Sequence, residues 1–337
     1  MKRALLLLAG LACASLAGWD IWSQLHAPLV LNEPRAVEVP YGATMNGLLR
    51  DFERSGVLTS PRQRVYLSWH ARLTGQAAAL KAGEYSVGTG LRALELTALL
   101  ASGQVVLHEL TLVEGWTFAQ ALAAVHAHQA IARALPDHGV ADPTALLMQQ
   151  LGAPGQPAEG RFYPDTYRFA RGTTDVEFLR RAYQAMEGVL AQEWAGRSPD
   201  LPYASPDEAL IMASIVERET GLVDERGEIA GVFVRRLQKK MRLQTDPSVI
   251  YGLGIKFDGN LRKRDLLADG PYNTYTRAGL PPTPICLPGR AALHAAMHPA
   301  AGKTLYFVAR GDGSHVFTET FADHDAAVRK YQLRRRR

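Results

Sequence analysis

A buried central helix is predicted by the segment SPDEALIMASIVERET, residues 205–220. Ser205 is a favourable N-cap, Pro206 suits the first helical position, and Glu208 completes a capping box. Residues 209–216 are almost entirely apolar and would cover most of the helix circumference. A helix that is apolar on nearly all sides has to be surrounded by protein, so this segment is expected to form the core of the larger part of the chain.

Two glutamates, Glu217 and Glu219, end this segment in surroundings that leave little room for water. Burial disfavours the charged form of a carboxyl and raises its pKa, which is what a general acid requires. The simpler alternative is that both glutamates mark the point where the helix emerges into solvent. At ~100° per residue they lie on opposite faces of the helix. The spacing therefore does not choose between them, and it argues against their acting together on one substrate atom.

The composition is that of a globular chain with about two domains. Of its 337 residues, 47% are hydrophobic and 21% are charged, which is enough to bury a sizeable core. The net charge of +5 is modest, and four arginines fall in the terminal run at residues 334–337. We therefore expect a solvated basic tail and no nucleic-acid partner.

The N-terminus carries an apolar run at residues 4–18, which two basic residues precede and two tryptophans follow. Such a run is either a signal peptide or a short membrane span. Tryptophan favours the membrane interface, and residues 14–17 offer only a loose cleavage site, so a retained transmembrane anchor over residues 1–24 is preferred. This predicts a single-pass protein of the inner (cytoplasmic) membrane, with everything after residue 25 outside the cytoplasm, in the periplasm.

The two cysteines do not provide a disulfide framework, because Cys13 lies inside the apolar run and Cys286 lies in the globular part. The fold must therefore be held by its hydrophobic core, even in an oxidising compartment. Lipidation of Cys13 is not expected, since Gly10 replaces the branched aliphatic residue of a lipoprotein signal.

Residues 35–104 are expected to form a small module with the order strand, helix, helix, strand. Residues 37–39 alternate like a strand, and residues 81–87 form a second one. Between them, Thr44 and Ser60 are good helix N-caps. This order resembles a LysM-type module, which in its family binds N-acetylglucosamine polymers. A purely structural α+β module explains the pattern equally well.

The rest of the chain is expected to be a larger α+β catalytic region, so that the fold class is α+β. Residues 105–204 are taken as its connecting part, residues 205–333 as the catalytic domain and residues 334–337 as the tail. Within the connecting part, EGRFYPDTY at residues 159–167 combines aromatic and polar side chains. Such a segment suits either a sugar site or a well-packed turn.

Two polar loops follow an amphipathic helix predicted at residues 225–241. They are RLQTDPSVIYG at residues 242–252 and PYNTYT at residues 271–276. Tyrosine can stack on sugar rings, and asparagine and threonine can bond hydroxyl or acetamide groups. The same composition is also ordinary turn material, so the loops by themselves indicate a cleft only weakly.

No metal, cofactor or nucleophile motif is apparent in the sequence. The ten histidines are scattered, and His126 and His128 would point to opposite sides of a helix. The stretch GDGSH at residues 311–315 places a serine beside a histidine, but a hairpin turn explains it better. Neither a metal nor a cofactor is therefore expected.

Three motifs in a fixed order make the chain recognisable: ASIVERET at residues 213–220, MRLQTDP at 241–247 and YNTY at 272–275. With them, nearly the whole chain resembles the endolytic murein transglycosylase family, also called MltG or YceG-like. The resemblance implies a lyase that cuts peptidoglycan glycan strands between N-acetylmuramic acid and N-acetylglucosamine and leaves a 1,6-anhydro end. It also implies that the cut terminates the elongation of newly made strands near the membrane.

One carboxyl suffices for this chemistry, since it can protonate the leaving oxygen and then help the 6-hydroxyl of muramic acid attack the anomeric carbon. The resemblance assigns that role to Glu217, the first glutamate of its motif, and a supporting role to Glu219. It further implies a substrate groove made of Gln244, Thr245, Asp246, Tyr272, Asn273 and Tyr275. The implied partners are peptidoglycan strands, the cytoplasmic membrane and proteins of cell-wall synthesis.

Two other functions remain open. A two-carboxylate muramidase would use Glu217 as acid and Asp246 as base or nucleophile, and would leave a reducing end. A wall-binding scaffold for the synthesis machinery would have no catalytic activity and would tolerate the substitution Glu217→Gln.

Overall fold

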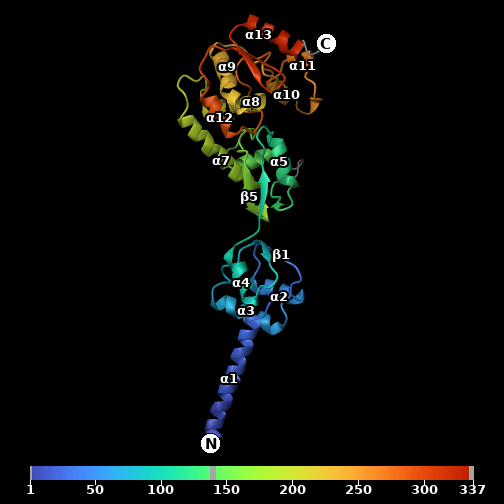
Figure 1. Cartoon of the computed structure of the whole chain (residues 1–337), viewed down its shortest axis with the longest axis vertical. Coiled ribbons are helices and arrows are strands. Elements are labelled where there is room, and N and C mark those ends of the chain that lie inside the picture. Colours follow the sequence, from blue (N-terminus) through green and yellow to red (C-terminus); the bar gives the residue numbers. More distant parts are fainter. Residues whose placement is uncertain (1, 137–141, 334–337) are drawn as a thin grey trace. The chain divides into compact units, whose positions relative to one another are not determined.

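Figure 1 shows the computed structural model, which describes residues 2–136 and 142–333. The described residues form helices and four two-stranded sheets, so the predicted mixture of α and β structure is confirmed. The chain divides into two compact units, which are Met1–Glu109 with Arg168–Thr173, and Leu110–Tyr167 with Thr174–Arg337. The predicted basic tail at residues 334–337 lies outside the described residues.

Helix α1 (Lys2–His26) contains the apolar N-terminal run. Its 25 residues extend ~37 Å at 1.5 Å per residue, enough to cross a hydrocarbon core of ~30 Å. None of its residues is buried. Among the described residues it is the one helix long and apolar enough to span a bilayer, a property that a membrane anchor and a signal sequence share.

The C-terminal turns of α1 are bound to the folded part of the first unit. Asp20 accepts a hydrogen bond from the Tyr66 hydroxyl (2.9 Å) and pairs with Arg62 (3.3 Å). Four residues later, the side-chain oxygen of Gln24 accepts a hydrogen bond from the Ser60 hydroxyl (2.6 Å). The C-terminal turns of α1 are therefore packed as part of the first unit.

The first unit has the predicted order of strand, helix, helix and strand. Its elements are β1 (Arg35–Val39), α2 (Met45–Arg54), α3 (Pro61–Leu73), β2 (Gly83–Val87) and α4 (Ala93–Ser102). Strands β1 and β2 pair in antiparallel fashion, and Thr44 and Ser60 cap α2 and α3 as predicted. Leu49, Leu67 and Tyr85 are completely buried in its core. This element order does not decide whether the module is of LysM type, which stays a prediction.

Two further strand pairs and two helices follow in the middle of the chain. They are β3 (Leu107–Thr111) with β5 (Thr166–Ala170), β4 (Ile131–Ala132) with β6 (Thr173–Thr174), and helices α5 (Phe118–Ala127) and α6 (Pro143–Gln150). Asp142 caps α6 by accepting from the Thr144 amide (2.9 Å).

Helix α8 (Pro206–Glu219) is the predicted central helix, and all residues from 209 to 216 are buried. Ser205 caps it by accepting a hydrogen bond from the Glu208 amide (3.4 Å). The Glu208 carboxylate accepts from the Ala204 amide (2.6 Å), one residue before the cap. The predicted capping box is therefore wrong in this detail, because the carboxylate reaches past the cap residue.

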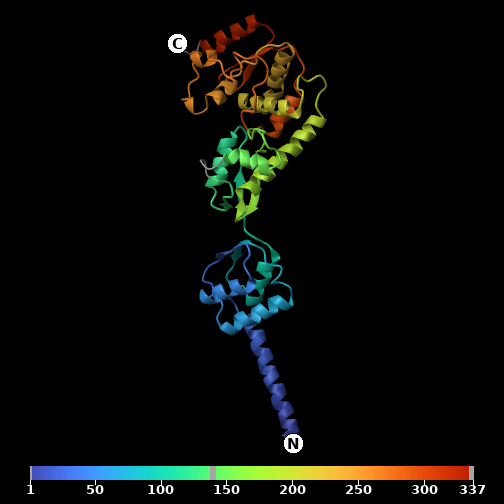
Figure 2. The same cartoon turned by 180° about the vertical axis from the view of Figure 1, so that it is seen from behind.

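Four helices pack around α8: α7 (Asp175–Ala195), α9 (Arg226–Gln238), α10 (Asp246–Leu253) and α12 (Arg290–Met297). Figure 2 shows these helices, coloured from yellow-green to orange, from behind. Ser214, the polar residue inside the apolar run, accepts a hydrogen bond from the Ile285 amide (3.0 Å), so its burial leaves no unpaired hydroxyl.

The remaining elements complete the second unit. They are η1 (Val223–Glu225), η2 (Gly254–Lys256), α11 (Lys263–Leu267), β7 (Tyr306–Ala309), β8 (His315–Thr318), α13 (Phe321–Val328) and η3 (Arg329–Leu333). Strands β7 and β8 form the predicted hairpin, with Val308 opposite Val316. Cys286 is a buried free thiol, and Cys13 is free and exposed on α1.

Candidate active site

A cavity of about 430 Å³ lies in the second unit, at the C-terminal end of α8. One part of its wall comes from α8, α9 and the loop that follows α9, and another part comes from the β7–β8 hairpin and α13. The polar side chains of the wall are Glu219, Arg236, Gln244, Asp246, Tyr275, Tyr306, His315, His324 and Gln332. Residues spread between positions 219 and 332 of the sequence thus surround one volume.

Glu219 is the last residue of α8 and lines this cavity. Burial raises the pKa of Glu219 to about 7, and the negative charge of Asp246 adds to the effect. The Thr245 hydroxyl and the Arg236 guanidinium oppose it. Near neutral pH, both the protonated and the ionised form of this carboxyl are therefore populated. This suits a group that must first donate and then accept a proton.

Glu217 lies on the opposite face of α8, and it is absent from the cavity wall. One carboxylate oxygen accepts from the Arg226 guanidinium (3.0 Å), and the other accepts from the Gly289 amide (3.0 Å). Burial raises the pKa of Glu217, whereas these two donors lower it. Its carboxylate is thus held within the protein by two partners.

Three of the six predicted groove residues line the cavity: Gln244, Asp246 and Tyr275. The Tyr275 hydroxyl donates to Asp246 (2.5 Å), which joins the two predicted loops. Gln244 has a left-handed backbone (φ 56°), an uncommon conformation that is costly for a residue other than glycine. The backbone turn at Gln244 therefore shapes the wall directly beside Asp246.

The other three groove residues support the loops. The Thr245 amide donates to the Thr274 hydroxyl (3.0 Å), and the Thr245 side chain is buried. The Asn273 amide group donates to three backbone carbonyls, those of residues 265, 266 and 268. Tyr272 packs edge-to-face against Tyr251, with ring centroids 4.9 Å apart. Of these side chains, none is part of the cavity wall.

His315 on β8 joins the site although the sequence analysis interpreted its surroundings only as a hairpin turn. Its Nδ1 lies 2.7 Å from a Glu225 carboxylate oxygen, and its backbone amide donates to the other oxygen (2.9 Å). The ring is thereby oriented by Glu225, and Nε2 is the nitrogen that remains for a ligand in the cavity. A glutamate 90 positions away in the sequence gives no local signal for this pair.

An aromatic surface forms another part of the wall, which the sequence analysis also missed. Tyr306 stacks with His324 (ring centroids 5.2 Å, 24° between planes) and meets Phe321 edge-on (6.0 Å). The Phe321 side chain is exposed. Flat rings beside polar groups are a suitable surface for a sugar ring.

The profile of the YceG-like family matches residues 37–330, a range that includes most of the cavity wall and most of both units. The chain belongs to the YceG-like family. The resemblance inferred from the three motifs is therefore confirmed.

Relatives of this YceG-like chain match most of its length. The endolytic murein transglycosylase of Bacillus subtilis is 30% identical over 308 residues, covering 88% of this chain and 84% of that protein. The endolytic murein transglycosylase of Streptococcus pneumoniae is 26% identical, covering 97% of this chain and 64% of that protein. A crystal structure of a YceG-like protein from Listeria monocytogenes superposes with a TM-score of 0.54 at 27% identity, covering 88% of this chain and 99% of that one.

Glu159 is a further buried carboxyl of this YceG-like chain, in the EGRFYPDTY segment. It accepts hydrogen bonds from the Phe118 amide (2.8 Å) and the Tyr251 hydroxyl (3.1 Å). Burial raises the pKa of Glu159 to about 7, against the effect of these donors. The carboxylate bonds the first amide of α5, which favours a helix-capping role.

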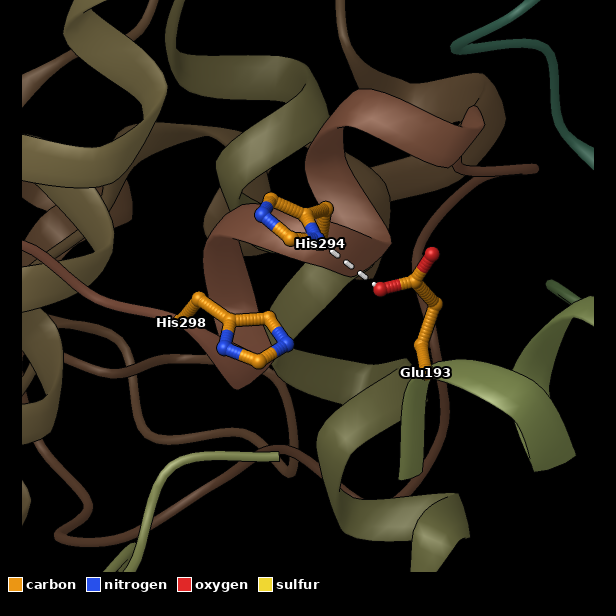
Figure 3. A group of neighbouring side chains, drawn as sticks. All are labelled: Glu193, His294 and His298. Atoms are coloured by element: carbon orange, nitrogen blue, oxygen red, sulfur yellow. Dashed lines mark hydrogen bonds and ion pairs between the residues drawn. The ribbon is translucent and has the colours of Figure 1, made fainter. Parts of the chain in front are cut away.

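The two histidines considered in the sequence do not converge. His126 lies 3.2 Å from Asp175, and His128 accepts from the Ala130 amide (3.2 Å). A different group does come together, formed by Glu193, His294 and His298 (Figure 3). It lies away from the wall of the cavity.

Proposed function

We propose that this chain is a membrane-anchored endolytic murein transglycosylase. It cleaves peptidoglycan glycan strands between N-acetylmuramic acid and N-acetylglucosamine and leaves a 1,6-anhydro end. Membership of the YceG-like family and the 30% identical relative of that name support the activity. The observation that carries the mechanism is the position of Glu219 in the cavity wall beside Asp246, where burial raises the pKa of Glu219 to about 7.

The proposed acid and base is Glu219, in place of Glu217. Protonated Glu219 donates its proton to the glycosidic oxygen as the bond to the anomeric carbon breaks. The resulting carboxylate then accepts the proton of the muramic acid 6-hydroxyl, whose oxygen forms the new bond to the same carbon. Glu219 ends the cycle protonated. Glu217 is less suited, because both of its oxygens are engaged by Arg226 and Gly289.

The remaining wall positions the sugar chain. Asp246 raises the pKa of Glu219 and is itself held by the Tyr275 hydroxyl. The His315 ring, oriented by Glu225, provides a nitrogen for a hydroxyl or acetamide group. The rings of Tyr306 and Phe321 supply a stacking surface.

Product chemistry tests this function against the alternatives. Full-length protein in detergent should convert uncross-linked glycan strands into internal fragments that end in 1,6-anhydromuramic acid, as measured by mass spectrometry. Reducing-end products would instead indicate a two-carboxylate muramidase. Binding of the strands without any cleavage would favour the scaffold.

The substitution Asp246→Asn should shift the pH dependence. Removing this negative charge lowers the pKa of Glu219, because the charge disfavours the ionised form. Because Glu219 acts first as an acid, kcat/KM falls as the pH rises through the pKa of Glu219. This falling alkaline limb of the pH profile should therefore move to lower pH in the variant. The same substitution at Asp51 on α2, far from the cavity in sequence, should leave the limb in place. An unmoved limb in Asp246→Asn would exclude Glu219 as the titrating acid.

We further propose that α1 is retained as a single-pass anchor with the N-terminus in the cytoplasm and the chain after α1 in the periplasm. The contacts of Asp20 with Tyr66 on α3 and of Gln24 with Ser60, the N-cap of α3, support this. Cleavage at residues 14–17 would leave these bonded turns at the new end of the chain, where a helix frays. Protein isolated from membranes should therefore have the mass of the uncleaved chain and should resist alkaline extraction. A mature N-terminus after residue 17 would contradict the anchor.

A further inference from the structure

Figure 3 shows three neighbouring side chains of the second unit: Glu193, His294 and His298. Glu193 comes from the last turn of α7, His294 from α12, and His298 directly follows α12. One ligand atom from each of the three lies within 4.8 Å of the others. A single ion can therefore contact all three after small side-chain rotations.

The donor set is chemically specific. His294 and His298 are four residues apart, a spacing that places two side chains on one side of a helix. Their rings stack with centroids 4.3 Å apart. Two imidazoles and one carboxylate are ligands that Zn²⁺ accepts in a tetrahedral site, with water at the fourth position.

The carboxylate is already oriented by its neighbours. Glu193 is 9% exposed, although a glutamate is rarely buried to this extent without partners. One of its oxygens lies 2.9 Å from His294 Nδ1, and the other accepts from the Arg290 guanidinium (3.3 Å). Arg290 can keep the second oxygen while the first binds an ion, as outer partners of metal-bound carboxylates commonly do.

We propose that Glu193, His294 and His298 bind one divalent transition-metal cation of the zinc class. Both histidines bind through an unprotonated ring nitrogen, so any proton on the ligating nitrogen moves to the other nitrogen or to solvent. When the ion binds, the direct hydrogen bond between His294 and Glu193 is lost, and each of the two residues forms a bond to the metal instead. A water molecule completes the coordination.

This site would act on the fold and leave the chemistry of the cavity unchanged. Helices α7 and α12 both pack against α8, the helix that ends at Glu219. An ion that joins the end of α7 to α12 therefore holds two of the helices around α8 together. Its expected effect is a higher thermal stability of the protein, since an ion that binds only the folded state stabilises it.

Metal titration of the full-length protein tests the proposal. The protein is purified in detergent without a polyhistidine tag and is stripped with a chelator. Cobalt should then give the visible absorption of a tetrahedral site at one equivalent per chain, and zinc should displace it and raise the melting temperature. Absence of saturable cobalt and zinc binding would overturn the proposal.

Three variants locate the ion. His298→Ala and Glu193→Gln should each weaken zinc affinity by at least ~10-fold, as loss of even an outer partner commonly does. His294→Ala changes an exposed side chain, so it should fold normally and lose the cobalt absorption. His70→Ala on α3 should retain full binding. Unchanged affinity in His294→Ala and His298→Ala would place any bound metal elsewhere and refute the site.

Discussion

Glutamine in place of Glu219 should lower the rate of strand cleavage by ~10²–10⁴-fold, the usual contribution of a positioned general acid and base. The amide has nearly the same shape, so the cavity should persist while the transferable proton is lost. Glycan binding should therefore change little, and the loss should appear in kcat. Single-turnover cleavage of purified strands, together with a binding measurement, separates the two effects.

The matched control is Glu217→Gln on the same helix. Its side chain contacts Arg226 and Gly289 and lies outside the cavity wall, so activity should fall by no more than ~10-fold, equivalent to about 1.4 kcal/mol. The opposite result, with Glu217→Gln inactive and Glu219→Gln active, would restore the assignment that the motif order suggests. Loss of activity in both variants, with normal folding, would show that Glu217 also contributes to the reaction.

Replacing Arg226 with methionine should destabilise the protein by ~3–5 kcal/mol, the usual cost of removing one partner of a buried ion pair. Arg226 is 7% exposed, and its guanidinium lies 3.0 Å from Glu217. Its removal leaves the buried Glu217 carboxylate near Glu114, whose carboxylate lies 3.9 Å from the same guanidinium nitrogen. Urea unfolding of the full-length protein in detergent measures the change.

The double variant Arg226→Met with Glu217→Gln tests the cause of this loss. If the unpaired charge is responsible, the second substitution should recover much of the stability, since both partners are then neutral. Arg54→Met provides a control at an exposed ion pair with Asp51 (3.5 Å), where the expected change is below ~1 kcal/mol. Equal losses in Arg226→Met and Arg54→Met would mean that burial of the pair has no role.

Local patterns predicted those elements in which neighbouring residues carry the information. The apolar run at residues 209–216, with Ser205 before it, is enough to specify a buried helix and its start. Thr44 and Ser60 mark two further helix starts in the same way. Alternation and a glycine-rich turn likewise indicated the hairpin whose strands carry Val308 and Val316.

Only some of the predicted groove residues line the cavity, because a polar loop residue can face either the cavity or its own backbone. Gln244, Asp246 and Tyr275 take the first orientation. Asn273 takes the second and bonds three carbonyls of its own loop. The same amide group satisfies either environment, so residue type alone does not distinguish them.

The sequence by itself determined the family, the central helix and the position of two candidate carboxyls at its end, since all of these depend on contiguous motifs. The tertiary structure decided which carboxyl faces the cavity. Glu217 and Glu219 lie ~200° apart around α8, and only the packing of the other elements determines which of these directions opens into the cavity. The tertiary structure alone also brought His315 to Glu225 and His294 to Glu193, which lie 90 and 101 positions apart. Such pairs depend on how helices and strands pack, and no local periodicity records that packing.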